Sequence, residues 1–350
     1  MQLDDYRLLG RSGLRVSPLA LGTMTFGVQQ SWGCDAAEAE KILGLYAESG
    51  GNSIDTANFY ANGESERVVG KLVRNRRNRF VIATKYSLTM SPGDPNACGN
   101  HRKNMMQSVE ESLRRLETDH IDLLYLHAWD ARTPVEEILR AFDDLVRSGK
   151  VQYIGLSNTP AWQASRMQAI AELRGWSPLV ALQISYSLAE RSGERDLLPM
   201  AREMGLGVLP WSPLAGGVLS GKYQQKDLTS GAEPSKASAR KDMNVSSGRL
   251  SDHSLVIADA VRKVAEEMNC SSAQVALAWT LLNPAVASPV LGIRTLAQLQ
   301  DNLGALDVNF RADQIAQLDA ASKIDLGVPH TMLASDVMSK MFGGVKVAKR

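Results

Sequence analysis

The chain has 350 residues, of which 44% are hydrophobic and 22% charged, and its formal net charge is +1. This composition supplies ample apolar material for one large core, and the length is compatible with a single α/β barrel. The near-neutral charge gives no reason to expect nucleic acid or an anionic membrane as a partner.

The cysteine content and the N-terminus indicate a cellular compartment. Cys34, Cys98 and Cys270 are widely spaced and show no metal-ligand pattern. An odd, sparse set favours a reducing compartment over a disulfide framework. The first ten residues lack an apolar signal core, and no segment reaches the roughly 20 apolar residues of a membrane span. We expect a cytoplasmic protein with no metal site and no membrane association.

Short β-rich segments alternate with longer amphipathic segments along the whole chain. Several of the short ones, such as 122–127, are almost continuously apolar, which is typical of parallel strands buried on both faces. The candidate strands, in chain order, are Arg15–Leu21, Ser53–Ala57, Phe80–Tyr86, Ile121–His127, Val151–Ser157, Leu179–Ser185, Gly207–Trp211 and Val286–Leu291.

Helix-period segments lie between the strands. In Lys103–Glu117 the apolar residues Met106, Val109, Leu113 and Leu116 recur at a spacing of three or four, which places them on one face. A second helix is expected to begin with Thr133 as N-cap and Pro134 as first helical residue, and to end near Gly149.

Eight strands, each followed by a helix, predict an α/β fold in the form of a single (β/α)8 TIM barrel. The alternative is a doubly wound sheet, which would place a Gly-x-Gly-x-x-Gly turn after the first strand. The segment Gly22-Thr-Met-Thr-Phe-Gly27 lacks that spacing. We expect one domain over residues 1–350, with a core of about 6–306.

Two stretches break the alternation. Tyr223–Leu250 is rich in Ser, Lys, Gly and Asp and predicts a long exposed loop after the seventh strand. Such a loop is either a mobile lid over a ligand or a disordered insertion. Residues 325–350 predict an irregular tail with a basic end.

Polar residues stand at the predicted carboxyl ends of the strands, where a barrel of this kind carries its active site. The second strand ends at Asp55, with Tyr60 in the following loop; the third ends at Lys85 and the fourth at His127. Each has an ordinary structural explanation alone, but together they place an acid, a phenol, an amine and an imidazole around one mouth.

These residues also carry a family resemblance. The segment from Gly51 through Asp55 and Tyr60 to Gly70 resembles the signature of the aldo-keto reductases. So do Ala83-Thr-Lys85, Asp122–His127, Gly155-Leu-Ser-Asn158 and Trp211-Ser-Pro-Leu214, in the family's order. The opening, 9–27, is similar to the bacterial aryl-alcohol dehydrogenase-like and potassium-channel β-subunit-like branches. The resemblance covers about 6–306.

The resemblance implies a catalytic tetrad of Asp55, Tyr60, Lys85 and His127. Tyr60 would be the general acid for the developing alkoxide, and a neighbouring Lys85 ammonium would lower the pKa of the phenol toward the working pH. Asp55 would hold Lys85 charged, and His127 would polarise the substrate carbonyl. The reaction is then reversible reduction of an aldehyde or ketone by hydride from a nicotinamide cofactor.

The resemblance also implies the cofactor contacts. Ser157, Asn158 and Gln183 would hold the nicotinamide carboxamide, Trp211 would stack on the ring, and Arg294 would pair with a 2′-phosphate, which favours NADPH over NADH. Gly292 and Gln298 stand where many mammalian members carry basic residues, so NADH use stays open. The remaining implied contacts are Gly22, Thr23, Met24, Asp55, Ser212, Pro213, Leu214, Gly216, Leu219, Gly221, Lys222 and Asn302.

A hydrophobic or aromatic carbonyl compound is the expected substrate. The expected pocket is formed by Met24, Phe26, Trp32, Tyr60, His127 and Trp129. Asp130 either recognises a substrate hydroxyl or faces water. Two other functions stay open: a regulatory subunit that uses the bound cofactor as a slow redox sensor, and a lyase that forms a Schiff base on a partly neutral Lys85.

Overall fold

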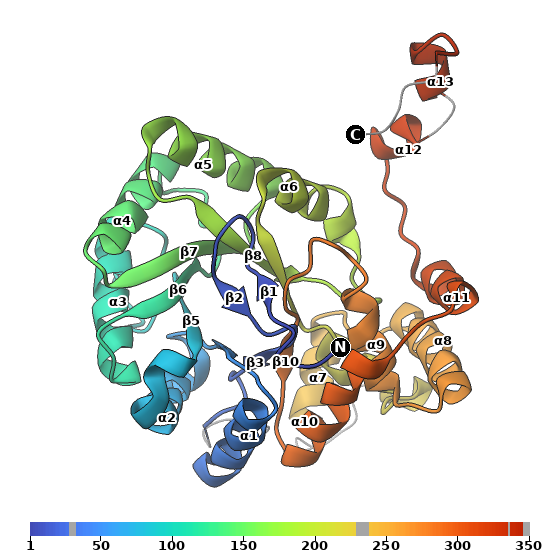
Figure 1. Cartoon of the computed structure of the whole chain (residues 1–350), viewed down its shortest axis with the longest axis horizontal. Coiled ribbons are helices and arrows are strands. Elements are labelled where there is room, and N and C mark those ends of the chain that lie inside the picture. The colour runs from blue at the N-terminus through green and yellow to red at the C-terminus, as the bar shows by residue number, and fades with distance from the viewer. Residues whose placement is uncertain (28–32, 229–237, 335–336, 346–350) are drawn as a thin grey trace.

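A computed structural model describes residues 1–27, 33–228, 238–334 and 337–345. Eight parallel strands form a nearly closed barrel surrounded by helices (Figure 1), which confirms the predicted (β/α)8 fold. The barrel strands are β3 (Ala20–Gly22), β4 (Ser53–Asp55), β5 (Val81–Tyr86), β6 (Ile121–Leu126), β7 (Val151–Ser157), β8 (Leu179–Ser185), β9 (Gly207–Trp211) and β10 (Val290–Gly292).

The segment that leads into β10 joins β9 and so brings the two edges of the sheet together. Ladder hydrogen bonds run in the order β10-β3-β4-β5-β6-β7-β8-β9. A parallel bridge joins Val208 of β9 to Val286, and the amide of Ala287 donates to the Val208 oxygen at 2.8 Å. Closure places all the carboxyl ends of the strands at one mouth.

Helices cover the outside of the barrel because each buries one apolar face against the strands. In α4 the buried residues Val135, Ile138, Leu139 and Phe142 recur at helical spacing. The helices that follow β3 to β8 are α1 (Ala36–Glu48), α2 (Glu64–Val73), α3 (Arg102–Leu116), α4 (Val135–Arg147), α5 (Ala161–Arg174) and α6 (Leu197–Met204). In the described residues, β9 is followed by α7 (Ser238–Ser246), α8 (Asp252–Met268) and α9 (Ser272–Thr280), and β10 by α10 (Leu296–Leu303) and α11 (Ala312–Ser322).

The first and last predicted strands are shorter than expected, and a proline interrupts each. Arg15–Leu21 divides into β2 (Arg15–Val16), which pairs antiparallel with β1 (Arg7–Leu8), and the barrel strand β3. Pro18 lies between them and Pro289 lies within Val286–Leu291, and a proline has no amide to donate to a ladder. The β1–β2 hairpin lies across the strands in Figure 1, and its residue Val16 packs with Val81 and Leu123 of the barrel interior.

The start of α4 also differs by one residue from the prediction. Pro134 is the N-cap, with φ −58° and ψ 136°, and the helix begins at Val135. The Thr133 hydroxyl donates to Asp130 at 2.8 Å instead of capping the helix.

The segment Tyr223–Leu250 is not a plain exposed loop where it is described. It contains a 3-10 turn at Gln225–Asp227 and the helix α7. Asn244 of α7 is fully buried, and its amide donates to the Gly216 oxygen at 3.1 Å and to the Tyr223 hydroxyl at 3.2 Å. The hypothesis of a lid depends largely on residues 229–237, which lie outside the described residues.

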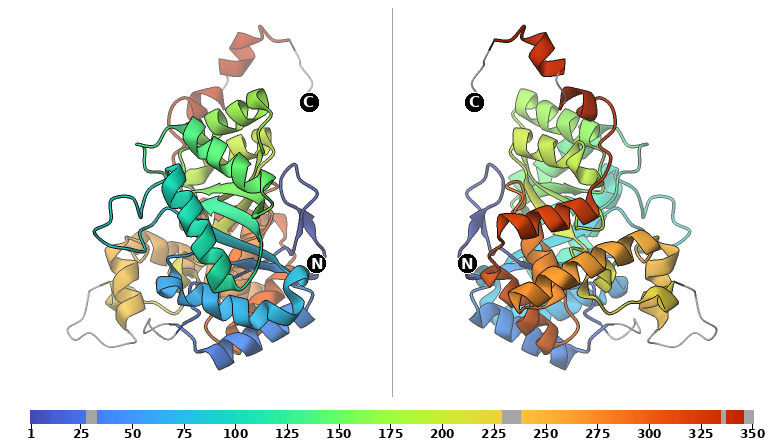
Figure 2. Two further views of the ribbon diagram at one scale, coloured as in Figure 1. Left: turned by 90° about the vertical axis from the view of Figure 1, so that its left-hand side faces the viewer. Right: turned by 90° about the vertical axis from the view of Figure 1, so that its right-hand side faces the viewer.

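Beyond α11 the chain leaves the barrel. The short helices α12 (His330–Leu333) and α13 (Val337–Met341) extend away from the helical layer (Figures 1 and 2). Among the described helices, none combines the length and the apolar character needed to cross a membrane.

Candidate active site

Three neighbouring strands bring the four predicted tetrad residues together. Asp55 ends β4, Lys85 lies near the end of β5, and His127 follows β6 directly. Tyr60 begins the 3-10 turn Tyr60–Gly63, which lies between β4 and α2. Because β4, β5 and β6 are adjacent in the barrel, these side chains lie at the same part of its mouth.

The Lys85 ammonium is the centre of the site. It is fully buried and donates to Asp55 Oδ2 at 2.6 Å, to the main-chain oxygen of Thr56 at 2.8 Å and to the Tyr60 hydroxyl at 3.1 Å. All three ammonium hydrogens therefore have acceptors. The sequence did not indicate Thr56, because a main-chain acceptor leaves no signature in residue type.

The electrostatics hold Lys85 in its charged form. Burial lowers the pKa of Lys85, but the Asp55 carboxylate and Tyr60 raise it by more, so the net pKa lies above the ordinary value. A Schiff-base lysine needs a substantial neutral fraction. The observed pair argues against the lyase.

Tyr60 differs from the expectation that its pKa is lowered. Burial raises the pKa of Tyr60 above its ordinary value; Lys85 opposes this shift, whereas the Asp55 charge adds to it. The phenol therefore stays protonated at neutral pH and is available as a proton donor.

His127 stands beside Tyr60 as a neutral imidazole. The two rings meet edge to face, with centroids 6.0 Å apart and an interplanar angle of 83°. Burial, with a smaller effect from Lys85, lowers the pKa of His127 to about 3. Its main-chain amide donates to the Tyr86 oxygen at 2.9 Å, which fixes the start of the loop after β6.

The residues predicted to hold the carboxamide are linked to the tetrad. Gln183 of β8 donates from Nε2 to Asp55 Oδ1 at 2.7 Å, so both carboxylate oxygens are engaged. Asn158 is exposed and donates to the His127 oxygen at 2.9 Å, while the Trp211 indole donates to Asn158 Oδ1 at 3.2 Å. Ser157, at the end of β7, is buried.

The loop after β9 has an unusual backbone. Ser212, Ala215, Gly216 and Gly217 all have positive φ, between 48° and 91°. A Cβ at Gly217 would lie 2.7 Å from the Lys222 ammonium, so the glycine lets this cation lie against the main chain. The other predicted contacts in this loop differ in exposure. Pro213 and Leu219 are buried, Leu214 is half-buried, and Gly221 and Lys222 are exposed.

Cationic side chains gather near this loop. Burial lowers the pKa of Lys222, and the nearby charges of Arg294 and Arg240 lower it further. The Arg249 guanidinium lies 5.4 Å from the centre of the Trp211 ring. The sequence does not single out Arg240 and Arg249, because the composition of their segment predicts an exposed loop. Mutual repulsion of this kind is relieved by a bound anion.

The residues after β10 form the start of α10. Arg294 and Gly292 are exposed, and the Arg294 amide donates to Gln298 Oε1 at 2.9 Å. Asn302 lies buried near the end of that helix. On β3, a Cβ at Gly22 would lie 2.7 Å from Val290 Cγ1, and the next residue, Thr23, is also buried.

The residues of the predicted substrate pocket differ in how far they are exposed at the mouth. Met24 and Trp129 are half-buried at the mouth, but Phe26 is 1% exposed and belongs to the core, so it offers no open wall. Trp32 lies outside the described residues. The Asp130 carboxylate accepts hydrogen bonds from the main-chain amides of Asn100, Arg132 and Thr133. These bonds stabilise the loop of Asp130 and favour a structural role over recognition of a substrate hydroxyl.

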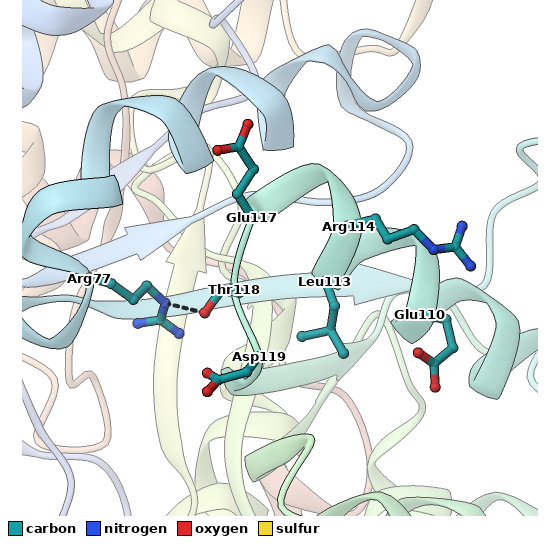
Figure 3. Close-up of a pocket in the computed structure, with 7 residues that line it drawn as sticks. All are labelled: Arg77, Glu110, Leu113, Arg114, Glu117, Thr118 and Asp119. Carbon is teal, nitrogen blue, oxygen red and sulfur yellow. Dashed lines mark hydrogen bonds between the residues drawn. The ribbon is translucent and has the colours of Figure 1, made fainter.

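A separate surface hollow contains none of these residues (Figure 3). Thr118 and Asp119 of its lining precede β6, so the hollow lies at the opposite end of that strand from His127. Arg77, in the same lining, is occupied by an ion pair of 2.6 Å with Asp122. The lining is Arg77, Glu110, Leu113, Arg114, Glu117, Thr118 and Asp119.

Comparison with known families assigns the chain to a class of oxidoreductases. The model of the aldo/keto reductase family matches residues 18–323, and the chain belongs to this family.

The similarity to known relatives covers most of the chain. A norsolorinic acid reductase of Aspergillus flavus is 37% identical over 95% of this chain and 84% of its own length. The oxidoreductase YrpG of Bacillus subtilis is 39% identical over 90% of this chain and 95% of its own. The aryl-alcohol dehydrogenase-like protein AAD14 of Saccharomyces cerevisiae is 33% identical over 96% of this chain and 91% of its own length. These relatives are similar to the chain in sequence, and the name of each is that of a reductase, an oxidoreductase or a dehydrogenase.

Proposed function

We propose that the protein is an NADPH-dependent oxidoreductase that reduces aldehydes or ketones reversibly, with Tyr60 as the general acid. The observation that carries this proposal is the fully buried Lys85 ammonium, bonded at once to Asp55 at 2.6 Å and to Tyr60 at 3.1 Å. A carbonyl oxygen that becomes an alkoxide needs a proton donor. A phenol beside a fixed cation is suited to that task, because the cation stabilises the phenolate left behind.

Each tetrad residue has a distinct task in this reaction. Tyr60 donates its hydroxyl proton to the carbonyl oxygen, and Lys85 stabilises the resulting phenolate. Asp55 keeps Lys85 charged and in place. The neutral His127 imidazole donates a hydrogen bond to the same carbonyl oxygen and polarises it. The nicotinamide cofactor, when bound, supplies the hydride.

The residues around the mouth fit a phosphate-bearing dinucleotide. The positive-φ residues after β9 bring main chain and Lys222 together, and Arg294 contributes a further positive charge to this region. These groups would hold the pyrophosphate and the 2′-phosphate, because guanidinium and ammonium groups bind phosphate through charge-assisted hydrogen bonds. Asn158 and Gln183 carry the amide groups that would hold the carboxamide, and Trp211 would cover the ring.

A hydrophobic or aromatic carbonyl compound is the proposed substrate. Met24 and Trp129 offer apolar surface at the end of the barrel that carries Tyr60. The names of two relatives point the same way, since one is a reductase of norsolorinic acid and another is aryl-alcohol dehydrogenase-like.

The test is NADPH consumption with aromatic, aliphatic and sugar-like carbonyls, with NADH for comparison. We expect Tyr60→Phe to keep cofactor binding while kcat falls about 100-fold or more, which is the usual contribution of a general acid. Normal turnover by Tyr60→Phe would contradict the role of Tyr60. Tight NADPH binding by the wild type without turnover would favour the regulatory subunit.

A further inference from the structure

A buried ion pair lies beside the turn that carries Tyr60. Glu66, in the first turn of α2, is 0% exposed, and its Oε2 accepts from Arg115 Nε of α3 at 2.6 Å. The other carboxylate oxygen, Oε1, accepts from the Thr84 hydroxyl of β5 at 2.5 Å. One carboxylate therefore joins α2 both to α3 and to the strand residue that precedes Lys85.

The turn Tyr60–Gly63 has a backbone that needs support from its surroundings. Ala61 and Asn62 have φ of 47° and 54°, in the left-handed region, and Gly63 follows with φ of 85°. This region is unfavourable for a residue with a side chain, and such a conformation persists only where the surrounding structure fixes it. The contacts at the two ends of the turn therefore decide whether it keeps its shape.

Both ends of the turn are fixed. Before it, the Asn58 amide donates to the main-chain oxygen of Lys85 at 3.2 Å. After it, Gly63 is the N-cap of α2, and a Cβ at this glycine would lie 2.8 Å from Arg115 Cδ. The glycine thus lets the arginine pack directly against the end of the turn, and the bond to Glu66 holds the arginine there.

The same contacts relate the turn to the Lys85 ammonium. Thr84 and Lys85 are consecutive residues of β5, so their side chains point to opposite faces of the strand. Lys85 reaches Tyr60 at 3.1 Å on one face, and Thr84 bonds to Glu66 on the other. The bond to Thr84 therefore ties the start of α2, directly after the turn, to the strand that carries Lys85.

We propose that Glu66 is a positioning residue, which with Arg115 and Thr84 clamps the turn Tyr60–Gly63 to β5 and so holds the Tyr60 hydroxyl beside Lys85. The inference rests on the proposed function, because it concerns the geometry of the same proton donor. Desolvation offsets much of the attraction within a buried ion pair, so stability alone does not account for this one. Loss of the clamp lets the left-handed turn relax and moves the hydroxyl away from the ammonium.

The test compares Glu66→Gln with the wild type in carbonyl reduction by NADPH. Glutamine keeps the size of the side chain but removes the charge that pairs with Arg115. We expect kcat to fall about tenfold or more, because a misplacement of about 1 Å at a reacting group costs up to about 100-fold in rate. The KM for the carbonyl and the affinity for NADPH should change less than about twofold, since ground-state binding does not use the Tyr60 proton. An unchanged kcat would overturn the inference.

Asp122→Asn is the matched control. Asp122 pairs with Arg77 at 2.6 Å, and the two side chains are only 17% and 14% exposed. This pair lies near the start of β6, at the opposite end of the strand from His127. We expect both variants to melt at a lower temperature than the wild type, but only Glu66→Gln to lose kcat. Equal losses of kcat in the two variants would assign Glu66 a purely structural role and overturn the inference.

Thr84→Val is a milder variant that decides the question even if Glu66→Gln does not fold. It removes the hydroxyl that donates to Glu66 Oε1 and leaves the ion pair with Arg115 in place. We expect kcat to fall a few-fold, with the KM for the carbonyl unchanged. A wild-type kcat in Thr84→Val would also overturn the inference.

A second measurement does not require turnover. Tyrosine labelled with carbon-13 at Cζ reports on the Tyr60 phenol by NMR, with Tyr60→Phe identifying its resonance. A displaced or broadened Tyr60 resonance in Glu66→Gln, but not in Asp122→Asn, supports the inference, and an identical resonance in all three proteins overturns it. If the wild type reduces no carbonyl, the proposed function fails, and the NMR comparison still decides whether Glu66 positions Tyr60.

Discussion

At the scale of single residues, the site depends on a buried ion pair whose members need each other. Lys85 is 0% exposed and Asp55 3% exposed. We expect Lys85→Met to abolish carbonyl reduction and to lower the free energy of unfolding by about 3–5 kcal/mol, because it leaves a buried carboxylate without its partner. Urea denaturation at neutral pH measures the loss.

Two further variants separate this effect from a general sensitivity to lost charge. Lys85→Met combined with Asp55→Leu should recover much of the lost stability without recovering activity, because no buried charge is left uncompensated. Arg74→Met removes the exposed pair with Glu117 and should cost less than about 1 kcal/mol. A Lys85→Met protein as stable as the wild type would contradict the assignment of a charged buried pair.

His127 predicts a dependence of stability on pH. The pKa of His127 is about 3 in the folded protein, below the ordinary value of 6.5. Between these two pH values the imidazole is protonated in the unfolded chain but neutral in the folded protein. The stabilising contribution is complete above about pH 6.5 and is lost as the pH falls toward 3. We expect His127→Gln to lose stability less steeply than the wild type across this window in denaturant titrations. Parallel curves would show that His127 is not the group responsible.

At the scale of elements, the sequence predicts the bounds of an element well where the local residue pattern determines them. It predicts them less well where packing against other elements determines them. β7, β8 and β9 have the predicted bounds, because each is rich in apolar residues and β7 and β8 end at a serine that precedes a change of pattern. The first and last barrel strands are shorter than predicted because of Pro18 and Pro289. The helix α7 was missed because its buried residue Asn244 is polar, and its burial depends on contacts with Gly216 and Tyr223.

The same distinction applies to the site. Asp55, Lys85 and His127 could be predicted to lie together because they stand at or next to the ends of adjacent strands, and Tyr60 because it lies in the loop that follows the first of these strands. The bond from Gln183 to Asp55 and the cations Arg240 and Arg249 could not be predicted. They depend on how β8, α7 and the residues directly after α7 approach the mouth, and residue type alone does not encode that geometry.

One asparagine connects two loops at the mouth. The amide of Asn100 donates to Ser87 Oγ at 3.0 Å and to the Ala128 oxygen at 2.8 Å, and its Oδ1 accepts from the Asp130 amide at 2.9 Å. Trp129 lies between these last two anchors. We expect Asn100→Ala to lower the free energy of unfolding by about 1–3 kcal/mol and to raise KM for the carbonyl, because buried groups lose their partners.

The cofactor should be bound normally by this variant, because the Asn100 side chain bonds to Ser87, Ala128 and Asp130, which are not among the residues proposed to hold the cofactor. Asn96→Ala is the control, since Asn96 is exposed in the same loop. Fluorescence titration with NADPH and steady-state kinetics measure the two effects. Equal losses of affinity for carbonyl and NADPH would indicate a general collapse of the site.

At the scale of the whole molecule, charge is concentrated locally although the total is only +1. Lys222, Arg240 and Arg294 influence one another near the loop after β9. We expect Arg294→Gln to weaken NADPH binding by about tenfold or more, the effect of losing a charge-assisted hydrogen bond, and to leave NADH binding nearly unchanged. Isothermal titration at two salt concentrations measures both affinities.

Rising salt should weaken NADPH binding more than NADH binding in the wild type, because the 2′-phosphate adds charge that mobile ions screen. Arg294→Gln should reduce this difference. Arg311→Gln is the control, since Arg311 is an exposed arginine paired with Glu267 and Asp313 beside α11. If Arg294→Gln weakened the binding of NADH and NADPH equally, Arg294 would act on a part shared by both cofactors, and the proposed preference for NADPH would lose its basis.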